Sequence, residues 1–189
     1  MTYQFKIQIN GIKRPTVWRR LCVPETISLH SFHEIIQMAF GWQNCHLYQF
    51  SSHGWGSDII YKNIDPDYDN ETVSDSALVN LSEIFVSEKQ KLKYIYDFGD
   101  NWEHDIILEK VSEENIYYSE CIDGKGACPP EDCGGVPGYL NLINILADPK
   151  HSHHKEMREW LGLHKGSQLN VDKFDIVAIN NRLRHLGLS

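Results

Sequence analysis

Two short runs of alternating apolar residues, separated by a turn, constrain the fold of this chain more than any other feature. In each run every second side chain is apolar or aromatic, which is the period of a β-strand that buries one face. These positions are Leu92, Tyr94, Tyr96 and Phe98 in the first run, and Trp102, His104, Ile106 and Leu108 in the second. Residues 97–101 join the runs and have the composition of a tight turn. We predict an antiparallel hairpin that buries Tyr94, Tyr96, Trp102 and Ile106.

The rest of the chain predicts further strands and a helix packed on them. Residues 3–9 and 16–23 read as two strands on either side of Asn10-Gly11, a pair that favours hairpins. Apolar residues at helical spacing predict a helix over 29–40, with Ser28 as its N-cap and Gly41 as its end. Shorter strands are predicted at 46–52, 59–61 and 116–121, with a loop over 62–80.

The predicted fold class is therefore α+β, with a mixed, mostly antiparallel sheet, one packed helix and a helical C-terminal segment. At 189 residues the chain is expected to form a single domain, residues 1–189. Its parts are a sheet-rich region over 1–121, a loop rich in glycine, proline and cysteine over 122–137, and a helical region over 138–187.

Composition favours a globular protein that remains in the cytoplasm. Hydrophobic residues make up 41% and charged residues 23% of the chain, as in ordinary globular domains. No apolar run approaches the roughly 18 residues of a membrane span, and the first ten residues alternate like a strand instead of forming a signal-peptide core. Five cysteines, an odd number, argue against a disulfide framework. We therefore expect a cytoplasmic protein with no membrane partner.

The net charge of −8 is unevenly spread along the chain. Residues 97–132 hold eleven acidic and two basic residues, whereas residues 1–20 hold five basic residues and no acidic one. An acidic centre repels a phosphate backbone, so we expect no appreciable binding to duplex DNA. Nucleic-acid handling through the basic segment 13–20, with Trp18 as a stacking residue, remains an alternative.

Four motifs stand out for their length and order. They are Val17-Trp18-Arg19-Arg20, the segment from Gly41-Trp42 to His46-Leu47-Tyr48-Gln49-Phe50, Tyr96-Asp97-Phe98-Gly99-Asp100-Asn101-Trp102-Glu103-His104, and Cys128-Pro129-Pro130-Glu131-Asp132-Cys133-Gly134-Gly135 with Gly138-Tyr139. Together they resemble the plasmid pRiA4b ORF-3-like family, from about residue 3 to residue 186. The resemblance implies an α+β fold and an association with plasmids and insertion elements, and it implies no demonstrated chemistry. Tyr48 departs from the pattern, because a second histidine is expected two residues after His46.

Three cysteines within thirteen residues, Cys121, Cys128 and Cys133, are the most chemical feature of the chain. Thiolates at such spacing can bind one tetrahedral Zn²⁺, and Pro129-Pro130 would stiffen the loop between two of them. With His104 they make a chemically sensible zinc set, if a metal is present. Inert buried thiols and a reactive cysteine are the alternatives for these residues. A buried imidazole that simply hydrogen-bonds a carbonyl or a carboxylate is the alternative for His104.

A binding site is predicted from the polar residues of the same motifs. Its candidate residues are Asp97, Asp100, Trp102, His104, Glu131, Asp132 and His46. The leading hypothesis is a non-catalytic binding or accessory protein that uses segments 97–104 and 128–135 to recognise a protein or small molecule. The alternative is a small, hydrolase-like, metal-dependent enzyme that uses the same loops. A metal with an open coordination position would favour the enzyme, and a closed four-ligand site the binding module.

Overall fold

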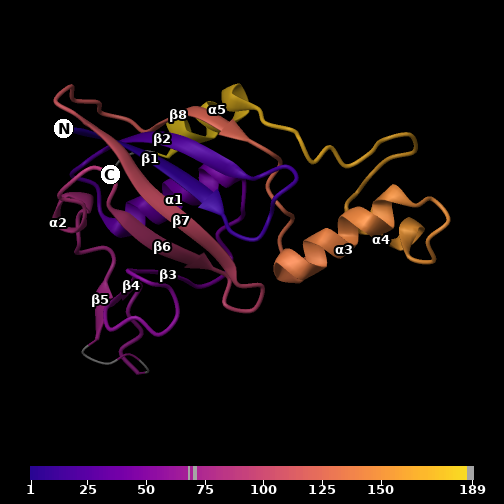
Figure 1. Ribbon diagram of the computed structural model, residues 1–189, viewed down its shortest axis with the longest axis horizontal. Coiled ribbons are helices and arrows are strands. Elements are labelled where there is room, and N and C mark those ends of the chain that lie inside the picture. The colour runs from indigo at the N-terminus through magenta and orange to yellow at the C-terminus, as the bar shows by residue number, and fades with distance from the viewer. Residues whose placement is uncertain (68, 70–71, 187–189) are drawn as a thin grey trace.

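The computed structural model describes residues 1–67, 69 and 72–186. Within them an eight-stranded sheet runs in the order β5-β4-β3-β6-β7-β1-β2-β8 (Figure 1). The strands are β1 (Thr2–Ile9), β2 (Trp18–Pro24), β3 (Tyr48–Ser51), β4 (Ile60–Lys62), β5 (Val73–Asp75), β6 (Lys91–Tyr96), β7 (Trp102–Ser112) and β8 (Glu120–Lys125). Neighbouring strands are antiparallel except β4 and β5, which are parallel. The predicted mixed, mostly antiparallel sheet is confirmed.

β6 and β7 form the predicted hairpin near the centre of the sheet. Tyr94 pairs with His104, and Tyr96 pairs with Trp102. The side chains of Tyr94, Tyr96, Trp102 and Ile106 are fully buried. The alternating pattern therefore predicted both the pairing and the buried face correctly, because a two-residue period leaves only one face that can be apolar.

The helix α1 (Leu29–Phe40) covers the apolar face of the sheet. Ser28 caps it, since its Oγ accepts a hydrogen bond from the Ser31 N–H at 3.1 Å, and Gly41 ends it with a φ of 94°. Both residues act as predicted. Phe32 of α1 packs on Phe5 of β1 with ring centroids 4.9 Å apart. The opposite face of the sheet carries ion pairs instead, including Lys93 with Asp105 and Arg20 with Glu109.

The remaining helices lie at the edges of the sheet. α5 (Ile176–His185) packs against α1 and β8, and it buries Ile179 and Leu183. α3 (Gly135–Ala147) and α4 (His154–Trp160) pack on each other and project beyond the end of the sheet (Figure 1). The short α2 (Leu81–Ile84) follows β5. No helix among the described residues is long and apolar enough to cross a bilayer.

The main departure from the sequence prediction is the last strand. It runs from Glu120 to Lys125, instead of ending at Cys121, and it pairs with β2 at the edge of the sheet. Strands that follow one another in sequence usually neighbour each other, yet β1 and β2 lie between β7 and β8. The predicted loop over 62–80 likewise contains β5, a strand too short to show a period.

Two histidines are buried in the core and are held there as neutral imidazoles. His33 Nδ1 lies 2.8 Å from Tyr94 Oη, and His33 Nε2 lies 2.7 Å from Asn44 Oδ1. His104 Nδ1 lies 2.9 Å from the Trp102 carbonyl oxygen. Burial lowers the pKa of His33 to about 3 and that of His104 to about 4, because the charged imidazolium loses its hydration.

Lowering the pH from 7 to 5 should therefore weaken the fold. In the unfolded chain His33 and His104 take up protons near the ordinary pKa of 6.5, whereas the folded protein keeps both neutral, so the unfolded state binds more protons in this window. Each histidine should lower the free energy of unfolding by about 2 kcal/mol at pH 5. Urea denaturation at the two pH values measures the loss.

The variant His104→Gln should show a smaller loss of stability between pH 7 and pH 5 than the wild type. His53→Gln changes an exposed histidine and should keep the wild-type difference. An equal loss in the wild type and in His104→Gln would contradict the assignment of His104 as a neutral core residue.

Candidate functional site

Three segments that are distant in sequence meet at one end of the central hairpin. They are residues 43–47, which follow α1, residues 97–101, which join β6 to β7, and residues 129–134, which precede α3. We call this meeting point the loop junction. Three main-chain N–H groups tie the segments to one another, each by donating to an oxygen in another segment. They are Asp97 to the Leu47 carbonyl (2.9 Å), Gln43 to Glu131 Oε1 (2.8 Å) and Gly134 to Asp100 Oδ2 (3.1 Å).

The backbone of the loop junction is held in an unfavourable conformation. Four residues other than glycine have a φ of 54–55°, namely Asn44, Asp97, Asn101 and Asp132. The left-handed region costs most L-residues roughly 1–2 kcal/mol, and Asn and Asp less, and non-glycine residues in it gather where a site needs fixed side chains. The left-handed backbone of Asp97 goes together with a carboxylate that faces two neighbours. Its Oδ1 accepts a hydrogen bond from the Gly99 N–H at 2.9 Å, while its Oδ2 faces the imidazole of His46.

Three carboxylates converge on a single atom, Nε2 of His46. The distances are 3.1 Å to Asp132 Oδ1, 3.6 Å to Asp97 Oδ2 and 4.0 Å to Glu131 Oε2. The side chains of Glu131 and Asp97 are only 9% and 10% exposed, whereas that of Asp132 is 68% exposed. Among the described residues no lysine or arginine forms an ion pair with any of the three. The junction is therefore acidic, and solvent reaches it on the Asp132 side.

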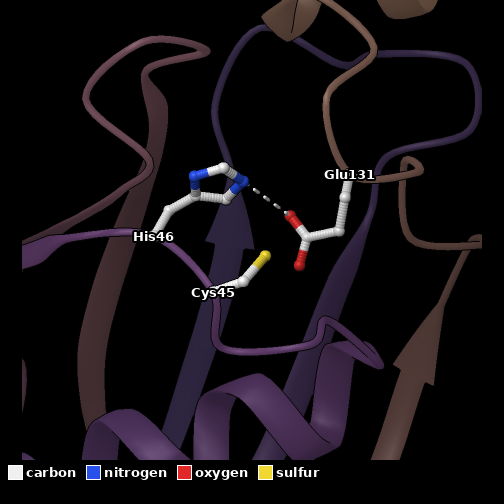
Figure 2. A group of neighbouring side chains, drawn as sticks. All are labelled: Cys45, His46 and Glu131. Carbon is white, nitrogen blue, oxygen red and sulfur yellow. Dashed lines mark ion pairs between the residues drawn. The ribbon is translucent and has the colours of Figure 1, made fainter.

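The carboxylate of Glu131 is satisfied on one side only. Its Oε1 accepts hydrogen bonds from the Gln43 N–H at 2.8 Å and from the Tyr96 hydroxyl at 3.0 Å. Its Oε2 is buried and makes no hydrogen bond. Nε2 of His46 is also buried without a hydrogen bond, even though Asp132 Oδ1 is near. These two atoms face each other as a long ion pair, 4.0 Å apart and without a hydrogen bond (Figure 2).

Cys45 completes a second cluster with His46 and Glu131. Its thiol points toward the gap between the imidazole and the carboxylate in Figure 2, and one ligand atom from each residue lies within 4.8 Å of the others. A nucleophilic relay uses one imidazole nitrogen for the nucleophile and the other for the carboxylate. Here all three carboxylates face Nε2, so none of them orients the imidazole through its other nitrogen as a relay requires.

Tyr96 supports the junction from beneath. Its hydroxyl accepts a hydrogen bond from the Cys45 N–H at 3.2 Å and donates one to Glu131 Oε1. Burial, together with the negative charge of Glu131, raises the pKa of Tyr96 far above its usual value. The hydroxyl therefore stays protonated and remains a hydrogen-bond donor.

The predicted zinc set of Cys121, Cys128, Cys133 and His104 is not assembled. No three of these residues, all of them described by the structure, bring their ligand atoms within 4.8 Å of one another. Cys121 lies in β8, where its Sγ donates to the Asp123 carbonyl oxygen, and two strands separate it from His104 in β7. Neighbouring strands lie about 4.8 Å apart, so Cys121 and His104 are well separated in the sheet.

The thiols of this set have the character of core residues. Burial raises the pKa of Cys121 to about 11 and that of Cys133 to about 12, and it raises the pKa of Cys128 well above its usual value. Cys121 belongs to the hydrophobic core, and Cys128 and Cys133 pack against it. Neutral thiols in such surroundings are poor nucleophiles.

The other candidate residues occupy supporting positions. Asp100 ties the turn to Gly134, and Trp102 and His104 lie in the core beneath the junction. Tyr48, at the position where a second histidine was expected, stacks on His33 with ring centroids 3.5 Å apart. Cys45 and Tyr96 were missed as members of the site, although each stands next in sequence to a residue that was named.

Three comparisons place the chain among known proteins. A family model described as plasmid pRiA4b ORF-3-like protein matches residues 1–181. The uncharacterized protein y4hQ of Sinorhizobium fredii (strain NBRC 101917 / NGR234) is 36% identical over 163 residues, which cover 84% of this chain and 80% of that protein. The crystal structure of the protein of unknown function MM3350 from Methanosarcina mazei Go1 matches with a TM-score of 0.76 and 30% identity, over 93% of this chain and 96% of that chain. These descriptions assign no chemistry.

The substitution Gly135→Ala should open the loop junction, and Gly162→Ala is its matched control. The two glycines have φ values of 63° and 64°, so an alanine meets the same backbone strain at either position. At Gly135 the added Cβ would lie 2.2 Å from the Asp100 carbonyl oxygen, whereas at Gly162 it would meet nothing within 4 Å. We expect Gly135→Ala to lower the free energy of unfolding by about 2 kcal/mol more than the control. Urea denaturation yielding equal losses would contradict the tight fit of Gly135, the first residue after the segment 129–134, on the turn.

Proposed function

The chain belongs to the plasmid pRiA4b ORF-3-like protein family, and we propose that it is a non-catalytic binding module that holds a positively charged ligand at the loop junction. The observation that carries this proposal is the convergence of Asp97, Glu131 and Asp132 on the Nε2 atom of His46. Carboxylates this close repel one another, and a cation between them removes the repulsion.

The rigidity of the loop junction supports a binding role. Its segments are anchored to one another by hydrogen bonds, and they follow α1, join the two strands of the central hairpin and follow β8, which are fixed parts of the fold. Binding groups on loops that a rigid scaffold positions do not have to be ordered when the ligand arrives. The exposed carboxylate of Asp132 gives a ligand in solution direct access to the site.

The basic segment at residues 13–20 supports this reading over nucleic-acid handling. The guanidinium of Arg19 is buried, and all of its hydrogen bonds go to main-chain carbonyls, those of Ala39, Trp18, Lys125 and Gly126. Arg20 is paired with Glu109 at 2.6 Å and with Asp123 at 2.9 Å. Because the guanidinium groups of Arg19 and Arg20 are engaged within the protein, and only Lys13 and Arg14 of this segment are exposed, we propose that the protein does not bind duplex DNA at physiological salt.

A thermal-shift experiment with a panel of cations tests the proposed function. The panel is spermidine, arginine amide and Mn²⁺, and a short DNA duplex serves as the anionic comparison. At a concentration ten times its dissociation constant, a ligand that fits the junction should stabilise the fold by about 1.4 kcal/mol, which raises the thermal midpoint by roughly 3–5 °C. The duplex should leave the midpoint unchanged.

Two variants locate the effect. Asp132→Asn removes one charge at the rim of the loop junction and should reduce the shift, whereas Glu159→Gln removes an exposed charge on α4 and should not. The proposal fails if no cation in the panel raises the midpoint, or if Asp132→Asn and the wild type respond equally.

A further inference from the structure

The loop junction has a charge imbalance that the protein itself does not correct. Asp97, Glu131 and Asp132 bring three carboxylates within 4.0 Å of one imidazole nitrogen. A protonated His46 could balance only one of these charges. Clusters of this kind exist on protein surfaces without a ligand, so the charge alone does not define a site.

The unpartnered oxygen of Glu131 is the independent observation. The side chain of Glu131 is only 9% exposed, its Oε1 is fully occupied, and its Oε2 has no hydrogen-bond partner. A buried carboxylate oxygen without a hydrogen bond is costly, and in native structures such an atom calls for an explanation such as a bound water or ion. This oxygen points at His46 Nε2, 4.0 Å away, which also makes no hydrogen bond (Figure 2).

The distances around His46 Nε2 match those between the ligands of one metal ion. Ligands bound at 2.0–2.2 Å lie about 3 to 4.3 Å from one another around the same ion. The three carboxylate oxygens lie 3.1, 3.6 and 4.0 Å from Nε2. The ligand atoms of His46, Asp97 and Asp132 also lie within 4.8 Å of one another. Glu131 belongs with His46 and Cys45 to a second such group, so its carboxylate would have to move toward Asp97 and Asp132 to share their ion.

The kinds of ligand select the class of metal. Carboxylates alone would suit Mg²⁺ or Ca²⁺, whereas an imidazole nitrogen among carboxylates suits a divalent first-row transition metal. The Cys45 thiol, which reaches the same gap, adds a softer donor that Mg²⁺ does not use. We infer that the loop junction is a binding site for a divalent transition metal such as Zn²⁺ or Mn²⁺, held by His46, Asp97, Asp132 and Glu131. This inference rests on the proposed binding function and names its ligand.

Isothermal titration of the metal-free, untagged protein with Zn²⁺, Mn²⁺ and Mg²⁺ tests the inference. We expect one equivalent of Zn²⁺ or Mn²⁺ to bind and Mg²⁺ to bind at least tenfold more weakly. His46→Gln and Asp97→Asn should each weaken the binding of the transition metal at least about tenfold, because each removes a ligand. His153→Gln is the matched control, since His153 lies in the exposed histidine cluster that starts α4, and it should bind like the wild type.

Glu131→Gln separates a metal ligand from a structural residue. The glutamine oxygen can still accept the hydrogen bonds from Gln43 and Tyr96, while the unpartnered charge is removed. The thermal midpoint of the metal-free variant should therefore equal or exceed that of the wild type, and its metal affinity should fall. A lower midpoint with unchanged metal affinity would show that Glu131 is only structural and would overturn its assignment as a ligand.

Three results would overturn the metal site as a whole. They are wild-type affinity in His46→Gln, loss of binding in His153→Gln, or no binding of either transition metal. The proposed function would survive such a result if spermidine or arginine amide still stabilised the wild type more than Asp132→Asn. If those ligands failed as well, both proposals would fall together.

Discussion

The turn that joins β6 to β7 is the constraint on which both the sheet and the loop junction depend. It sets the register in which Tyr96 faces Trp102, and that register decides which side chains of the two central strands enter the core. The same turn carries Asp97 in a left-handed conformation, so its carboxylate is aimed by the backbone and not by a flexible side chain. A shift of one residue in this hairpin would exchange the faces of the strands and would also move Asp97 away from His46.

The loop junction places stabilising and destabilising features side by side. Main-chain hydrogen bonds to Glu131 and Asp100 hold the segments together, while strained backbone and mutually repelling carboxylates act against the fold. Proteins tolerate such local costs where they serve a function, and substitutions that relieve them tend to raise stability at the expense of binding. The hydrophobic core beneath, with Trp102 and Tyr94 fully buried, offsets these costs.

The features that the sequence predicted well are those that depend on local patterns. The hairpin, the helix α1 and the caps Ser28 and Gly41 follow from periodicity and backbone preference within a few residues. The position of β8 did not follow, because its pairing with β2 is a long-range contact that no local pattern records. That one pairing also explains why the predicted zinc set is not assembled, since it leaves two strands between Cys121 and the strand that carries His104.

The site was predicted only in part, because local patterns do not record long-range contacts. His46, Asp97, Glu131 and Asp132 were named because each belongs to an unusual motif, and the fold brings these four together. Their order around one nitrogen could not be predicted, since it depends on how three distant segments cross. Tyr96 was expected only to be buried, because alternation shows which face a residue takes but not which polar atom its hydroxyl meets.

Anomalous diffraction from crystals of the protein grown with Mn²⁺ tests the central claim most directly. The account predicts a manganese peak about 2.2 Å from His46 Nε2, bounded by carboxylate oxygens of Asp97, Glu131 and Asp132. A peak confined to the histidines that precede α4, His151 and His153, or no peak at the loop junction at full manganese saturation, would contradict it.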